Sequence, residues 1–289
     1  MRPALHPPQI RSWTMSDGYE LRGRVWPGRA GGAAIIYLHG IQSHGGWYEW
    51  SASRLAETGA TVIMPDRRGS GANAARRGDV PNVDRWLRDI DELAEWAHES
   101  AGTRAVALVG VSWGGKLAAL WAFERRPAAT DLLMIAPGLF PQVDLRMARK
   151  LSVAWSIVRG GDAMFEIPLS DAALFTENNA GQAFIANDDL KLSHVTGRFL
   201  LCSARLDRRL VRMPDAGLSA RCTLLLAGRD RIIRNHATKR WLQGKASGEP
   251  RIVVFEQASH TMEFESDPRL FEAALTTWRD GLIKSAQDQ

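Results

Sequence analysis

The feature that most constrains the fold of this chain is a series of short apolar runs that do not alternate with polar residues. Six runs rich in Val, Ile, Leu and Ala have the length of a β-strand and end in turn residues: 33–40, 61–66, 105–110, 131–138, 222–228 and 251–257. Strands that are apolar at successive positions are buried on both faces, as in a parallel sheet covered by helices. We therefore expect a mostly parallel central sheet.

Segments with helical patterns lie between these runs. Helices are predicted at 51–60, 82–100 and 114–127, the last one ending at Pro127. The strongest pattern is in 82–100, where apolar residues recur about every 3.6 positions and form one stripe. Strands alternating with helices predict the α/β class, with a sheet flanked by helices. Residues 12–26 add the pattern of an antiparallel hairpin that turns at Asp17-Gly18.

The regular alternation breaks between residues 139 and 217. This stretch has irregular apolar patterning and several short helix-like pieces, of which 146–160 is the clearest. Ligands of open parallel sheets bind at the carboxyl ends of the strands, where an insertion can cover them. We therefore predict a core formed by 1–138 and 218–289, and a helical lid formed by 139–217.

One five-residue motif points to chemistry. Gly110-Val111-Ser112-Trp113-Gly114 fits G-x-S-x-G and stands where an apolar run gives way to a helical one. Such a turn exposes the serine hydroxyl, and its glycines let the strand and helix backbones approach closely. The alternative is an ordinary turn between a strand and a helix. We predict Ser112 as a nucleophile.

A serine hydroxyl is a weak nucleophile at neutral pH and needs a base. If the acid and the histidine follow the serine in the chain, the candidate bases are His194, His236 and His260. His194 lies in the predicted lid, and His236 is expected on the surface of a helix. His260 follows the last apolar run, at the carboxyl edge of the predicted sheet. We predict His260 as the base.

The base needs a carboxylate that orients it and stabilises the imidazolium. Asp230 stands just past the end of the 222–228 run, at the same predicted edge. Its alternative role is to cap a helix, which is common for Asp at this position. Asp207 and Glu263 are weaker candidates because neither directly follows a core strand. We predict Asp230 as the acid.

A tetrahedral intermediate also needs backbone N–H donors for its oxyanion. We expect one from Trp113 and one from Ile41, which follows the first core run. His39 is expected to shape the Ile41 loop by hydrogen bonding. Aromatic residues near these positions predict an apolar mouth, although packing of the scaffold is their alternative role. The predicted substrate-binding residues are His39, Gly40, Trp47, Tyr48 and Trp155.

Composition argues against several other classes. The net charge is +5, but the basic residues are dispersed and fit no nucleic-acid-binding motif. Cys202 and Cys222 lie in apolar stretches, and no cluster of His, Cys or Asp has metal-ligand spacing, so we expect buried thiols, no metal and no cofactor. The longest apolar stretches fall well short of the roughly 20 residues that span a bilayer, and we see no signal core. We expect a cytoplasmic protein with no nucleic-acid partner and no stable membrane insertion, and leave its oligomeric state open.

Five motifs occur in an order that resembles a known superfamily. They are His39-Gly40, the turn from Asp66 to Gly71, the Gly110 to Gly114 motif, Gly228-Arg229-Asp230 and Ala258-Ser259-His260. Together they resemble the α/β hydrolases, in particular the branch of lysophospholipases, monoacylglycerol lipases and serine aminopeptidases. The resemblance implies the α/β-hydrolase fold, with nucleophile, acid and base roles for Ser112, Asp230 and His260. It also implies a structural rather than catalytic role for the Asp66 turn.

Three functions are consistent with these residues. The first is a serine hydrolase of small-molecule carboxylic esters with a lipid-like or other apolar acyl chain. The second is an aminopeptidase similar to proline iminopeptidases, which needs carboxylates to hold the substrate's ammonium group. The candidates for that role are Glu166, Glu177, Asp188 and Asp189. The third is a non-catalytic binding protein on the hydrolase scaffold, which typically lacks a member of the catalytic set.

Overall fold

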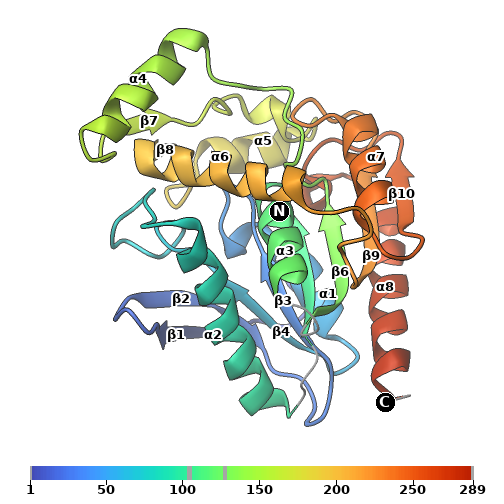
Figure 1. Ribbon diagram of the computed structural model, residues 1–289. Helices are drawn as coiled ribbons and strands as arrows, with labels where there is room; N and C mark the ends of the chain where they lie inside the picture. The colour runs from blue at the N-terminus through green and yellow to red at the C-terminus, as the bar shows by residue number, and fades with distance from the viewer. Residues whose placement is uncertain (1, 103–105, 126–128, 288–289) are drawn as a thin grey trace.

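The computed structural model describes residues 2–102, 106–125 and 129–287, and an eight-stranded sheet forms its centre (Figure 1). The strand order is β1-β2-β4-β3-β5-β6-β9-β10. The strands are β1 (Gln9–Thr14), β2 (Glu20–Trp26), β3 (Ala34–Leu38), β4 (Thr61–Pro65), β5 (Val106–Val111), β6 (Ala129–Ile135), β9 (Arg221–Ala227) and β10 (Arg251–Phe255). Neighbours from β4 to β10 run parallel, whereas β2 pairs antiparallel with both β1 and β4.

The six continuously apolar runs of the sequence correspond to the six parallel strands. Every residue of β3, β4 and β5 is buried, because helices cover both faces of the sheet at these strands. The predicted α/β class and mostly parallel sheet are therefore confirmed. The first residue of the 105–110 run and the predicted helix end at Pro127 lie outside the described residues.

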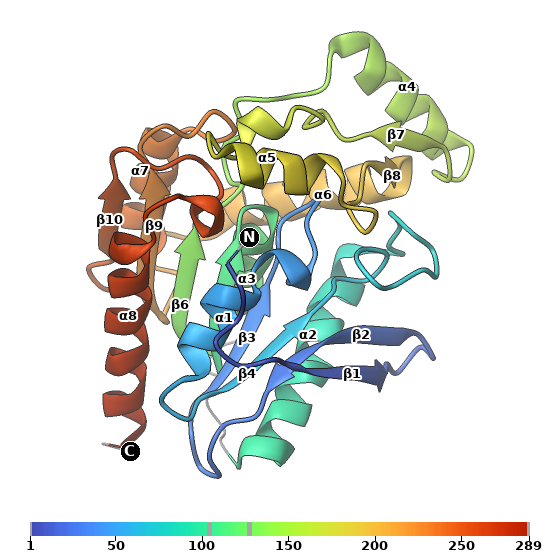
Figure 2. The ribbon, with the colours of Figure 1, turned by 180° about the vertical axis from the view of Figure 1, so that it is seen from behind.

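α1 and α8 cover one face of the sheet, and α2 and α3 cover the other (Figures 1 and 2). The helices of this part of the chain are α1 (Glu49–Ala56), α2 (Val83–Ala101), α3 (Trp113–Glu124), α7 (Asn235–Lys245) and α8 (Arg269–Gln287), with the 3₁₀ turns η1 (Gly45–Trp47) and η3 (Met262–Phe264). α2 begins where the Asn82 side chain accepts a hydrogen bond from the Arg85 amide. It ends at Gly102, whose φ of 67° is one that glycine adopts without strain.

Residues 139–217, which we call the cap segment, lie over the carboxyl ends of the parallel strands (Figures 1 and 2). Its elements are α4 (Met147–Val158), β7 (Met164–Glu166), η2 (Ala172–Leu174), α5 (Asn179–Ala186), β8 (His194–Thr196) and α6 (Gly197–Arg212). β7 and β8 form a separate antiparallel pair. α6 packs against α4 of the cap segment and also against α3 of the core. The predicted division into core and lid stays a prediction.

Within the described ranges, we find no helix with both the length and the apolarity that crossing a bilayer demands. Cys202 and Cys222 are both buried free thiols.

Candidate active site

Ser112 occupies the sharp turn between β5 and α3. Its backbone has φ 51° and ψ −122°, a strained conformation for a residue with a side chain. The Ser112 amide donates to the Ile135 carbonyl at 2.9 Å, and the Ser112 carbonyl accepts from the Gly138 amide at 2.7 Å. These bonds to the last residue of β6 and to the segment after it hold the turn in place, and Ser112 remains partly exposed.

The glycines of the motif are required by the close approach of three backbones. A Cβ on Gly110 would lie 2.5 Å from the Cα of Gly115. A Cβ on Gly114 would lie 2.3 Å from the carbonyl oxygen of Leu38, at the end of β3. The spacing of G-x-S-x-G therefore follows from packing β5 and α3 against β3.

Three distant segments meet at this turn. The Oγ of Ser112 lies 2.9 Å from Nε2 of His260, and Nδ1 of His260 lies 2.7 Å from Oδ2 of Asp230. The side chains of His260 and Asp230 are almost fully buried, at 2% and 0% exposure. The other oxygen of Asp230 accepts from the amides of Ile232 and Ile233 at 2.8 and 3.0 Å. With Oδ2 accepting from Nδ1, neutral His260 presents an unprotonated Nε2 to the hydroxyl.

The other candidates from the sequence lie elsewhere. His194 and His236 are exposed, on β8 and α7. Asp207 pairs with Lys116 at 2.7 Å, and Glu263 is buried and accepts from the Ser51 amide at 3.0 Å. Of the candidates named for nucleophile, base and acid, only Ser112, His260 and Asp230 are brought together.

The two predicted oxyanion residues flank the serine. Trp113 is the first residue of α3, so its amide is one of those that a helix leaves without an intrahelical acceptor. Ile41 follows Gly40, where an added Cβ would lie 3.4 Å from the Cβ of Ser112. His39 is buried beneath this loop, where it contacts the Gly40 carbonyl at 2.8 Å and the Arg67 amide at 2.7 Å.

The predicted aromatic mouth is mostly packed into the protein. Trp47 is buried against Phe175, Phe184 and Phe264, and its Nε1 donates to Asp188 at 2.6 Å. Tyr48 is also buried, and its hydroxyl donates to Ser43 at 3.1 Å. Trp155, in contrast, is 63% exposed on α4. The substrate-binding roles of His39, Gly40, Trp47, Tyr48 and Trp155 stay predictions.

Two residues near the site were not singled out from the sequence. Phe175, in the cap segment, packs edge-on against the His260 ring with centroids 6.1 Å apart. Arg67, in the turn assigned a structural role, donates hydrogen bonds to the carbonyls of Gly40 and Ile41. In the sequence, Arg67 is distinguished only by its place in the turn from Asp66 to Gly71.

The sequence matches a known family over most of its length. The family model described as serine aminopeptidase, S33, matches residues 31–267. The uncharacterized protein YnbC of Escherichia coli K12 is 26% identical over 225 residues, which are 76% of this chain and 38% of that protein. Phospholipase YtpA of Bacillus subtilis is 24% identical over 244 residues, 84% of this chain and 93% of that protein. The chain thus spans well under half of the Escherichia coli protein and nearly all of the Bacillus subtilis one.

A solved structure shares the fold. The crystal structure of a monoacylglycerol lipase from Paleococcus ferrophilus superimposes with a TM-score of 0.79 at 20% sequence identity, covering 91% of this chain and 99% of that one. The segment matched by the family model contains every strand from β3 to β10 and also Ser112, Asp230 and His260. The chain therefore belongs to the serine aminopeptidase S33 family and is an α/β hydrolase.

Proposed function

We propose that the protein is a serine hydrolase of carboxylic esters with an apolar, lipid-like acyl chain, in which Ser112 is the nucleophile, His260 the base and Asp230 the acid. The observation that carries the proposal is the continuous hydrogen-bonded series from the Ser112 hydroxyl through His260 to the buried Asp230 carboxylate. This series supplies what a serine hydroxyl needs in order to attack a carbonyl at neutral pH.

The reaction proceeds in two steps. His260 removes the proton of Ser112 as the hydroxyl oxygen attacks the ester carbonyl, and the amides of Ile41 and Trp113 stabilise the oxyanion. The intermediate then expels the alcohol, which takes its proton from His260, and leaves an acyl-enzyme. Water attacks the acyl-enzyme in the same way and releases the acid. Asp230 keeps His260 oriented and stabilises its protonated form throughout.

Two observations favour an apolar ester. Phospholipase YtpA is a relative of this chain, and one structural neighbour is a monoacylglycerol lipase. In addition, one face of α4 exposes the apolar side chains Met147, Leu151, Trp155 and Val158. α4 contains no acidic residue and carries Arg149 and Lys150 beside this face. We propose that the cap segment acts as a lid and that this face contacts aggregated substrate.

An aminopeptidase is the second candidate, favoured by the description of the family. Such an enzyme needs a carboxylate available for the substrate's ammonium group. Asp188 accepts from Trp47 and contacts His44 at 3.2 Å, and Glu177 pairs with Arg229 at 2.9 Å. Asp188 and Glu177 thus already have partners, and the other two candidates, Glu166 and Asp189, are exposed on the surface, so we favour the esterase.

Turnover of two substrate sets separates the candidates. We expect wild-type protein to hydrolyse p-nitrophenyl esters, with the acyl chain varied from acetyl to palmitoyl, and Ser112→Ala to be inactive. We expect little release of naphthylamine from aminoacyl naphthylamides. A preference for the aminoacyl substrates would replace the esterase by the aminopeptidase. Ester hydrolysis that survives Ser112→Ala would rule out both.

A further inference from the structure

Arg67 is a buried arginine in the turn from Asp66 to Gly71, and its charge is not paired in the way that the charge of its neighbour is. Its neighbour Arg68 pairs with Asp17 and Asp89, at 3.0 and 2.7 Å. Arg67 is equally deep, at 8% exposure, yet in the described part of the chain it has no carboxylate partner among the ion pairs. Burying a cation without a paired anion costs folding free energy. A compensating role for Arg67 is therefore expected.

The Arg67 guanidinium binds the loop after β3. Nη1 donates to the carbonyl of Gly40 at 2.9 Å, and Nη2 donates to the carbonyl of Ile41 at 3.1 Å. The Gly40 carbonyl and the Ile41 N–H belong to one rigid, planar peptide group and point in opposite directions. A bond that fixes the Gly40 carbonyl therefore also fixes the direction of the Ile41 N–H, the proposed oxyanion donor.

His39 holds the same carbonyl from a second side. Its Nε2 accepts the backbone N–H of Arg67 at 2.7 Å, so the ring proton is on Nδ1. Nδ1 then donates to the Gly40 carbonyl at 2.8 Å. Burial, followed by the nearby Arg67 charge, holds the pKa of His39 well below its usual range, so the ring stays neutral. A carbonyl that accepts two hydrogen bonds polarises its peptide group and makes the N–H a stronger donor.

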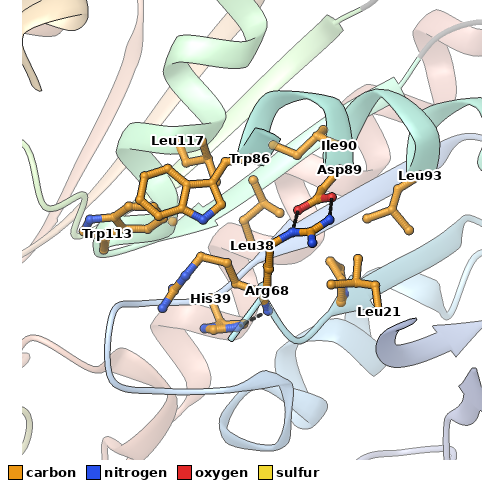
Figure 3. A pocket seen from close by; sticks show the side chains of 13 residues that line it. Leu21, Leu38, His39, Arg68, Trp86, Asp89, Ile90, Leu93, Trp113 and Leu117 are labelled. Atoms are coloured by element: carbon orange, nitrogen blue, oxygen red, sulfur yellow. Dashed lines mark hydrogen bonds and ion pairs between the residues drawn. The ribbon is translucent and has the colours of Figure 1, made fainter. Parts of the chain in front are cut away.

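The face of the guanidinium packs on Trp113, which supplies the second oxyanion amide. The centre of the guanidinium lies 4.7 Å from the Trp113 ring centroid and 5.4 Å from that of Phe199. The Trp113 ring is fixed in turn by Trp86, edge-on at 4.7 Å, and by a hydrogen bond from Nε1 to Ser203 at 3.0 Å. Figure 3 shows Trp113, Trp86 and His39 around one pocket that Arg68 and Asp89 also line, with the Arg68 guanidinium paired to Asp89.

We propose that Arg67 is a positioning residue that locks both oxyanion-hole amides, that of Ile41 through the Gly40 carbonyl and that of Trp113 through its ring. This inference rests on the proposed serine-hydrolase function. It predicts that losing Arg67 weakens binding of the tetrahedral intermediate far more than binding of the substrate, since a substrate carbonyl makes less use of the oxyanion hole.

The test compares Arg67→Met and Arg67→Lys with the matched control Arg68→Lys. Arg68 lies in the same turn, equally buried, but its side chain is paired with carboxylates rather than with the loop after β3. The readouts are kcat and KM on a soluble p-nitrophenyl ester, the affinity for an alkyl boronic acid that forms a tetrahedral adduct with the serine, and the melting temperature. Active enzyme is counted by fluorophosphonate titration.

We expect Arg67→Met to lower kcat and boronic acid affinity by about 100-fold each, with KM within about threefold of the wild-type value. Arg67→Lys keeps the charge but reaches only one of the two carbonyls, so we expect a loss of about 10-fold in both quantities. Arg68→Lys should lower the melting temperature and leave kcat and boronic acid affinity unchanged.

Wild-type kcat and boronic acid affinity in folded Arg67→Met would overturn the inference, as would equal losses in Arg68→Lys. If Arg67→Met does not fold, kcat and boronic acid affinity are compared in Arg67→Lys instead, and wild-type values there would overturn the inference. Failure of the proposed function has a different signature, because wild-type protein would then neither hydrolyse esters nor react with the fluorophosphonate. That result would overturn the inference together with the function.

Discussion

The carboxyl edge of the sheet buries polar side chains, whereas the outer face of α4 exposes apolar ones. At the edge, His39, Arg67 and His260 are buried and each is held by hydrogen bonds of defined direction. On α4, Leu151 and Trp155 are 66% and 63% exposed. Buried polar groups must be paired, and pairing fixes their geometry, whereas exposed apolar groups are stabilised by whatever covers them. We infer that the edge determines the reaction and that the cap segment determines the substrate.

The largest expected effect is at the edge, where one hydrogen bond sets the orientation of the base. We expect Asp230→Asn to lower kcat by about 10⁴-fold, because the amide favours the wrong tautomer of His260. The measurement is turnover of a soluble p-nitrophenyl ester. Asp207→Asn is the control. Asp207 pairs with Lys116, so we expect this substitution to leave turnover unchanged. An active Asp230→Asn enzyme would remove Asp230 from the catalytic set.

The next effect tests how tightly the edge is packed. In Gly114→Ala the new methyl group meets the Leu38 carbonyl at 2.3 Å, so α3 and β3 must separate. We expect kcat to fall by roughly 100-fold, since this shift misplaces both Ser112 and the Trp113 amide, and we expect the melting temperature to drop. Gly248→Ala is the control, because its added Cβ meets nothing within 4 Å. If kcat and the melting temperature were the same in Gly114→Ala and Gly248→Ala, catalysis would not depend on the close packing of α3 against β3.

A smaller and more selective effect is expected on α4. Leu151→Glu and Trp155→Glu place a charge on the exposed face, so we expect about 10-fold slower turnover of a long-chain monoacylglycerol in anionic vesicles. Turnover of soluble p-nitrophenyl acetate should not change, because both side chains lie exposed on α4. Leu270→Glu on α8, where the leucine is 71% exposed, serves as the control. If turnover of the monoacylglycerol and of p-nitrophenyl acetate both fell, α4 would affect the catalytic residues at the sheet edge rather than contact with the substrate surface.

The smallest effect concerns Glu263, a buried carboxyl three residues after His260. Burial raises its pKa from 4.5 to about 7, although the Ser51 amide bonds one of its oxygens. At Glu263 the folded protein therefore binds more protons than the unfolded chain between these values, so the contribution of this group to stability falls as the pH rises from about 4.5 to 7. Urea unfolding from pH 5 to 8 measures this. We expect Glu263→Gln to flatten the decline; an unchanged pH dependence would assign it to other groups.

The sequence was sufficient for the sheet and for the residues at its edge. Continuous apolarity identifies strands that are buried on both faces, and this property does not depend on details of packing. Ser112 was located by the glycines on either side of it, whose need for close approach is local. Asp230 and His260 followed from their positions just past strand ends, because the carboxyl ends of parallel strands meet at one edge.

The cap segment was harder to predict because a periodic apolar stripe does not say which way it faces. Met147, Leu151, Trp155 and Val158 recur at helical spacing, a pattern typical of a buried face, yet they face solvent. The buried positions of α4 are Val153 and Ser156. Arg67 was missed for a different reason: its partners, Gly40 and Ile41, are 27 and 26 residues earlier in the chain and contribute only backbone carbonyls. No sequence pattern indicates which way the apolar stripe of α4 faces or which carbonyls Arg67 binds.

Covalent labelling of the serine tests most directly whether the three converging segments act as one unit. Wild-type protein and His260→Gln are treated with a fluorophosphonate, and the adduct is located by mass spectrometry, with His236→Gln as the control. We expect a single adduct on Ser112 in the wild type and in His236→Gln, and a labelling rate at least about 10³-fold lower in His260→Gln. An adduct on a different serine, or undiminished labelling of Ser112 without His260, would contradict the proposed site.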